Sequence, residues 1–573
     1  GYMSIAEYAI QKKTITWVMT FVLLIGGVLS FTGLSRLEDP AFSIKDAVVV
    51  TAYPGASAEE VERQVTDVIE TEIQRLGQLK RIKSISKPGL STITVSIQDK
   101  YDSATLPSVW EQLRRKINDV QSKLPPGVSK PKVIDDFGDV YGILFAITGD
   151  GYSYKEIYEF TKLLRRELLL VDGVAKIDLW GVQKEAIYVE FSNSKLSQLG
   201  ISPGEIQSAL SEKNKVISAG HVLVGEEYLR IDTTGSVDAV EDIENLILRK
   251  GDVTDGSKLI YLKDIASVRR EYVAPADKIL HMNGHSAISL GASVVEGGNV
   301  VDMGFALQAR LDEIMAETPV GIEIHPISMQ HESVVLSIDN FIVSLEQAVA
   351  IVIVVLLLFM GVRSGLIIGA VLLVTVVGTF ILMDLQEVAL QRISLGALVI
   401  ALGMLVDNAI VVTEGMLVRI QAGEDRIKAA RDVVAQTMWP LLGATVIAIL
   451  AFAAIGVSQD STGEFCRSLY EVMLFSLGLS WVTAITITPL FCVAFLPGPK
   501  HGAPKVDGSD AYSGAVFVAY RKFLAMCLNF RWMTLTLMVA LLVSSIWGFM
   551  QLKGSFFPAS TMTKYMLHYW LPQ

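Results

Sequence analysis

The sequence predicts a membrane α-helical bundle that carries a large external α+β domain. Of its 573 residues, 51% are hydrophobic and only 19% are charged, which is too apolar for an ordinary soluble protein of this size. Seven stretches are apolar over the roughly 20 residues that a helix needs to cross a bilayer. The long segment between the first two stretches alternates strand-like patterns with amphipathic helical patterns.

The seven apolar stretches give the order of the predicted spans. The first follows Lys12 and Lys13 and has no small-residue cleavage site, so we expect it to stay as an anchor. Basic residues such as Arg363 and Arg419 fall on one side if the spans alternate, and that side is the cytoplasm. The external domain is therefore expected in the periplasm of a Gram-negative cell. The stretches are residues 14–34, 337–360, 365–384, 393–418, 437–457, 469–496 and 532–552.

The external domain is predicted to contain two split βαβ units of ferredoxin-like type. The order strand, helix, two strands, helix occurs across 45–123 and again across 140–213. The segment at about 216–265 has its own strand patterns and reads as an insertion in the second unit. The predicted subdomains are 37–136 with 320–333, and 137–319 including the insertion.

A longer repeat relates the two ends of the chain. Lys13–Pro40 and Arg531–Pro558 both run 27 positions from a basic residue, through one apolar span, to a proline. We therefore expect the first half, plus one span, of a protein built from two parallel repeats, with twelve spans in full. The other predicted segments are a first span in 1–36, spans two to six in 334–498, a cytoplasmic linker helix in 499–530, a seventh span in 531–553 and the truncated start of a second periplasmic repeat in 554–573.

The fourth span, LGMLVDNAIVVTEG, contains an aspartate, Asp407, at its centre. A charge there costs roughly 2.5–3.5 kcal/mol on insertion scales, so its default interpretation is functional. An acid that alternates between a low-dielectric environment and a nearby cation or donor takes up and releases a proton. Gly403 and Glu414 lie on the same helical face, and Glu346 in the second span is a further ionisable group. For both glutamates, a solvated helix-end position is the alternative.

The sequence resembles the resistance-nodulation-division superfamily of proton-driven exporters, most closely its multidrug branch. The matching stretches are GMLVDNAIVVTEGM in the fourth span, YPGASAEEVERQVTDVIETEI at 53–73, GLSTITVSI at 89–97 and LEDP at 37–40. The resemblance implies a homotrimer in the bacterial inner membrane with a periplasmic porter domain, a periplasmic adaptor and an outer-membrane channel as partners. It also implies small amphiphilic substrates and the proton gradient, rather than a cofactor, as the energy source.

Position 408 departs from the two adjacent aspartates of the family's motif. Asn408 cannot take up a proton, so we expect Asp407 to be the only titrating acid on this helix and Asn408 to be a hydrogen-bond partner. The resemblance places the family's lysine counter-charge in the second half of such a protein. It also makes Trp180 and Tyr141 candidate substrate contacts, with core packing as the alternative, and the insertion a loop that docks on a neighbouring subunit.

Other classes of function stay open. A metal-ion exporter would use methionine pairs, but the 18 methionines are scattered. A protein-export accessory would need a smaller external domain, and a receptor with a sterol-sensing type bundle would need no acid in the fourth span. The net charge of −11 argues against nucleic acid. HMNGH at 281–285 is predicted to be a turn rather than a metal site, and no phosphate-binding GxxxxGK[ST] loop or other enzyme motif occurs.

Overall fold

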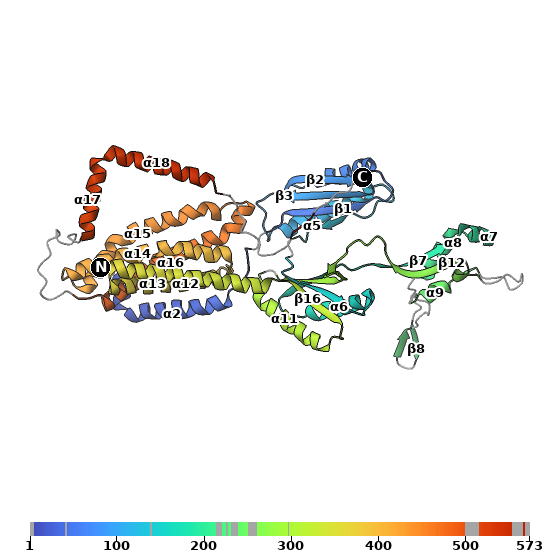
Figure 1. Ribbon diagram of the computed structural model, residues 1–573, viewed down its shortest axis with the longest axis horizontal. Helices are drawn as coiled ribbons and strands as arrows, with labels where there is room; N and C mark the ends of the chain where they lie inside the picture. Colours follow the sequence, from blue (N-terminus) through green and yellow to red (C-terminus); the bar gives the residue numbers. More distant parts are fainter. Residues whose placement is uncertain are drawn as a thin grey trace.

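The computed structural model is elongated, with the long apolar helices side by side at one end and the β-sheets beyond their outer ends (Figure 1). Two helices near the C-terminus, α17 (Ala515–Asn529) and α18 (Arg531–Met550), extend away from the other helices. The structure describes residues 5–40, 43–137, 140–213, 221–224, 227–230, 239–249, 260–295, 297–498, 515–552 and 565–567.

Seven helices within the described residues are long and apolar enough to cross a membrane, and each overlaps one of the predicted stretches. A helix satisfies its own backbone hydrogen bonds, as a bilayer requires. Side-chain caps at Gln391, Asp425 and Asp460 begin three of them. The helices are α2 (Lys13–Gly33), α12 (Gln330–Met360), α13 (Val362–Leu385), α14 (Arg392–Gln421), α15 (Arg426–Gly456), α16 (Ser461–Phe495) and α18; a short helix, α1 (Ile5–Gln11), precedes α2.

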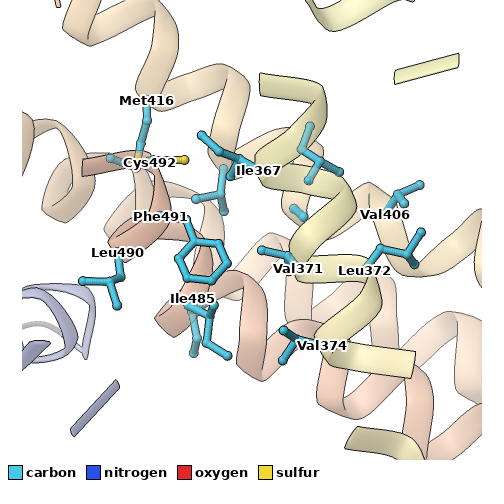
Figure 2. Packing of buried hydrophobic residues seen from close by; sticks show 14 of the residues in the cluster. Ile367, Val371, Leu372, Val374, Val406, Met416, Ile485, Leu490, Phe491 and Cys492 are labelled. Atoms are coloured by element: carbon cyan, nitrogen blue, oxygen red, sulfur yellow. The ribbon is translucent and has the colours of Figure 1, made fainter. Parts of the chain in front are cut away.

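The helices α13, α14, α15 and α16 share an apolar core. Figure 2 shows part of it, with Ile367 and Val371 of α13, Val406 of α14, and Ile485 and Phe491 of α16. On α14 the buried apolar residues, among them Leu405, Ala409 and Val412, recur at three- and four-residue spacing, so this helix buries one face and leaves another uncovered. The uncovered face of α14 is the one that carries the predicted acids.

The first four-stranded sheet is antiparallel and has the strand order β2-β3-β1-β4. Alternate residues such as Val49 and Ile93 point to one face, where they pack against Ile69 and Leu113 of the covering helices. The elements are β1 (Asp46–Ala52), α3 (Ala58–Val61), a π-type turn (Glu62–Thr66), α4 (Asp67–Ile73), β2 (Leu79–Lys87), β3 (Leu90–Ile97), α5 (Leu106–Val120), a 3₁₀ turn (Gln121–Lys123) and β4 (Lys132–Ile134).

The second four-stranded sheet has the order β16-β5-β15-β6, which is the same connectivity as the first. Its apolar face packs against α6 and α11, and its last strand runs directly into α12. The elements are β5 (Ile143–Gly149), α6 (Tyr154–Leu168), β6 (Val174–Trp180), β15 (Ile288–Val294), α11 (Val300–Glu317) and β16 (Ile322–Met329).

This sheet is not completed within 140–213, where the sequence pattern predicted a whole unit. The next strand, β7 (Glu185–Phe191), pairs with β12 (Ala266–Tyr272) in a separate two-stranded sheet, and β15 takes the expected place. Local alternation predicts a strand but not its distant partner, which explains the error. The remaining elements are α7 (Asn193–Leu199), α8 (Pro203–Lys213), β8 (His221–Val224), β9 (Glu227–Arg230), α9 (Val240–Glu244), β10 (Ile247–Arg249), β11 (Ile260–Tyr261), α10 (Leu262–Ile265), β13 (His281–Met282) and β14 (His285–Ser286).

Several predicted segments lie partly outside the described residues. The longest such portions belong to the insertion at 216–265, the linker at 499–530 and the last segment at 554–573.

Candidate functional site

Asp407 lies halfway along α14 and on its exposed face. Gly403, one turn earlier, is exposed on the same face, and a Cβ built there would meet no atom within 4 Å. Val411 and Glu414 continue this exposed stripe toward the inner end of the helix. In the part of the chain that the structure describes, Asp407 has no hydrogen bond and no ion pair, so its carboxyl group is available to a group from outside this set of helices.

Asn408 points the other way, into the interface between α14, α15 and α16. Its side chain is 6% exposed, and its amide nitrogen donates to Thr445 Oγ1 at 3.2 Å and to Ser480 Oγ at 3.1 Å. Ser480 Oγ in turn donates to the backbone oxygen of Leu405 at 2.9 Å. Asn408 was expected to be a hydrogen-bond partner, and its hydrogen bonds go to hydroxyls of α15 and α16. These bonds lie on the side of α14 away from the exposed face of Asp407, because successive residues on a helix lie about 100° apart.

The polar contacts continue from Ser480 into the bundle. Thr483, one turn later on α16, lies within hydrogen-bond distance of Thr375 on α13, with 3.0 Å between the two hydroxyl oxygens. These hydroxyls are buried, and the sequence interpretation did not select any of them. The signal was present in the SWVTAIT segment of the sixth span, where Ser480 and Thr483 are three residues apart and share a helical face. They hold neighbouring helices together through hydrogen bonds.

The two glutamates occupy different helices. Glu414 is exposed and follows Asp407 by two turns on the same face of α14. Glu346 is exposed near the middle of α12, so the alternative that it lies at a helix end is wrong. Neither glutamate has a hydrogen bond or ion pair within the residues that are described.

Trp180 and Tyr141 lie on the open face of the second sheet, opposite α6 and α11. The Tyr141 hydroxyl donates to Asp178, whose side chain precedes Trp180 by two positions on β6, and the tyrosine ring packs over Gly291. Burial and the Asp178 carboxylate both raise the pKa of Tyr141. The Trp180 ring is 52% exposed, with Lys278 Nζ at 4.2 Å from its centroid. The aromatic pair therefore faces outward and is not part of the apolar core.

HMNGH forms the β13–β14 hairpin. Asn283 and Gly284 at its turn have φ values of 52° and 88°, the left-handed region that Asn-Gly favours. His281 pairs with Ser286 and Met282 pairs with His285, so the two imidazoles project from opposite faces of the hairpin. Within the described residues, no group of three His, Cys, Asp or Glu side chains is placed to hold a metal ion.

A family model described as the AcrB/AcrD/AcrF family matches residues 5–573. The chain is similar to proteins named multidrug resistance protein MdtC: it is 24% identical to that of Yersinia enterocolitica and 25% identical to that of Enterobacter sp. strain 638, each over 554 residues. Each match covers 96% of this chain and 53% of the relative, so the chain spans about half the length of the curated relatives it matches.

Proposed function

Because the chain belongs to the AcrB/AcrD/AcrF family, we propose that it forms part of a proton-driven exporter of amphiphilic or hydrophobic compounds, in which Asp407 carries the proton. The family is one of multidrug transporters, and the chain is a multi-pass protein of the bacterial inner membrane. One observation carries the proposal: a carboxyl group lies halfway along a membrane-length helix, on an exposed face, with no partner in the described residues.

The proton mechanism follows from the cost of that position. An ionised carboxylate is disfavoured where lipid or apolar side chains surround it, and a cation or donor that approaches makes ionisation favourable again. Each proton that crosses the membrane supplies about 2.3 kcal/mol per 100 mV, which is sufficient to shift a conformational equilibrium of a few kcal/mol. Asp407 is proposed to alternate between these two environments.

Asp407 acts alone on its helix in this proposal. Asn408 does not titrate, and its amide is committed to hydroxyls of α15 and α16. Glu414 and Glu346 are proposed as secondary members of the proton path because both are exposed on membrane-length helices, Glu346 near the middle of α12 and Glu414 two turns inward of Asp407 on α14. Gly403 leaves room beside Asp407 for a close approach by another helix. No cofactor is proposed, and the proton gradient supplies the energy.

The remaining features are assigned by the same reasoning. The two four-stranded sheets with equal connectivity are proposed to be ferredoxin-like porter repeats in the periplasm. Trp180 and Tyr141 on the open face are proposed substrate contacts, since exposed aromatic rings offer large contact areas to amphiphilic compounds. A twelve-span homotrimer, a periplasmic adaptor, an outer-membrane channel and a docking role for the insertion complete the proposal.

Transport by the full-length protein in liposomes tests the role of Asp407. With an imposed proton gradient, Asp407→Asn should lower export of a fluorescent amphiphilic dye by about tenfold or more, because the amide cannot exchange a proton. The matched control is Asp384→Asn, which neutralises an exposed acid near the outer end of α13 and should change export by less than about twofold. Gradient-driven export at the wild-type rate by Asp407→Asn would overturn the proposal.

A further inference from the structure

The segment between α2 and β1, described at residues 34–40 and 43–45, is bonded to the outer ends of two other membrane-length helices. We propose that Arg392 of α14 and Glu464 of α16 couple movements of these helices to the first four-stranded sheet, through ion pairs with Glu38 and Lys45. This coupling role rests on the proposed function, since it assigns the route by which proton-driven movement would reach the outer domain.

Backbone hydrogen bonds fix the first part of the segment. The Leu37 N–H donates to the oxygen of Leu390 at 3.0 Å, and the Leu390 N–H donates to the oxygen of Ser35 at 2.9 Å. The Arg392 N–H donates to the oxygen of Glu38 at 3.4 Å. The chain that leaves α2 therefore runs alongside the loop that leads into α14.

An ion pair strengthens this attachment at the first residue of α14. Arg392 Nη2 lies 2.8 Å from Glu38 Oε1, and Arg392 Nη1 lies 3.6 Å from Asp39 Oδ1. The Arg392 and Glu38 side chains are only 16% and 10% exposed. Gln330, the first residue of α12, donates to the other oxygen of Glu38 at 3.5 Å. One carboxylate thus contacts the outer ends of two membrane-length helices.

A second ion pair holds the end of the segment where it enters the sheet. Lys45 Nζ lies 2.5 Å from Glu464 Oε2, and the Lys45 side chain is 8% exposed. The N–H and hydroxyl of Ser43 both donate to Glu464 Oε1, at 2.9 and 2.7 Å. Lys45 directly precedes β1, and its backbone oxygen accepts from the Ile97 N–H at 2.8 Å. Glu464 lies in the first turn of α16, so the pair joins that helix end to the β1–β3 ladder.

These contacts supply a connection that the covalent chain does not. The second sheet is continuous with α12 through β16, whereas the first sheet follows α2 and has no covalent junction with α14 or α16. Arg392 and Asp407 are on one continuous helix, about 22 Å apart at 1.5 Å per residue. α16 is bonded to the centre of α14 through Ser480 and Asn408. A shift of α14 around Asp407 therefore reaches both ion pairs, and their partial burial keeps the charges close and poorly screened.

The test separates coupling from folding by measuring dye export and proton flux together, in liposomes that contain the full-length protein. Arg392→Gln and Glu464→Gln should lower dye export by about tenfold while Asp407-dependent proton flux stays within about twofold of wild type. Arg392→Lys keeps a positive charge beside Glu38 and should retain most of the export. Lys80→Gln is the matched control, because it breaks an exposed ion pair with Asp99 that lies within the first sheet unit.

Each outcome decides the matter. A low ratio of dye exported to protons moved in both neutralised variants, with recovery in Arg392→Lys, supports the coupling role. An unchanged ratio overturns it, and so does a parallel loss of export and proton flux, because that is the result of a purely structural defect. If the Asp407→Asn variant exports dye at the wild-type rate, the proposed function fails and the coupling role fails with it.

Discussion

Asn408 provides a quantitative test of how the helices around Asp407 are held. Replacing it by alanine removes two hydrogen bonds, one to Thr445 on α15 and one to Ser480 on α16. Interhelical hydrogen bonds in membrane proteins average about 0.6 kcal/mol and reach about 1.7 kcal/mol each. Two such bonds, together with the small cavity that the buried amide leaves, give an expected loss of about 1–3 kcal/mol.

Unfolding by SDS from mixed detergent micelles, followed by tryptophan fluorescence, measures this loss. Thr445→Val removes only one of the two bonds and should cost about half as much. In the double variant the two effects should not add, and the interaction energy of the cycle should be about 0.6 kcal/mol. Additive effects, or an alanine variant as stable as the wild type, would refute the claim that these two hydrogen bonds stabilise the packing of α14 against α15 and α16.

Transport by the same variant tests whether the two adjacent positions have separate roles. Asn408→Ala should keep gradient-driven export within about threefold of wild type, because the residue carries no proton and faces away from Asp407. A loss of export of about tenfold or more in a folded Asn408→Ala variant, as expected for Asp407→Asn, would show that position 408 takes part in the proton path.

Three further predictions concern other parts of the fold. Gly27→Ala in α2 should lower the melting temperature, because the added Cβ would lie 2.1 Å from the Val377 backbone oxygen. Such overpacking costs about 1–3 kcal/mol. Gly26→Ala is the control and should be tolerated, because its Cβ would lie 3.1 Å from the end of the Ile381 side chain. Burial raises the pKa of Tyr154 from 10.0 to about 12, so the folded state favours the neutral phenol, and this stabilisation is complete below pH 10 and is lost as the pH rises toward 12. Because phenylalanine cannot ionise, Tyr154→Phe should not share this loss, so its melting temperature should rise relative to that of the wild type above pH 10; the same pH dependence in both proteins would contradict the shifted pKa. Trp180→Ala should raise the KM for dye export by about two- to tenfold with kcat little changed, while Trp180→Phe should stay near wild type; equal KM values in both variants would contradict a substrate contact.

The sequence was sufficient to predict features that depend on local chemistry. A bilayer-spanning segment satisfies its backbone hydrogen bonds by itself, so apolar runs of sufficient length located the membrane-length helices. The same holds for the turn at Asn283 and Gly284, where the residue types favour positive φ. Asp407 was selected because an acid in a spanning segment is costly wherever it points. None of these inferences required knowledge of a distant partner.

Tertiary structure decided every feature that depends on which distant segments meet. The pairing of β15 with β5 and β6, the hydrogen bonds of Asn408 to α15 and α16, and the ion pair of Lys45 with Glu464 join residues far apart in the chain. Strand alternation and helical periodicity state which face of an element is apolar, but they carry no information about the element that covers it. The sequence by itself therefore determined the spans and their central acid, whereas only the packed structure determined that Asp407 faces outward and its neighbour inward.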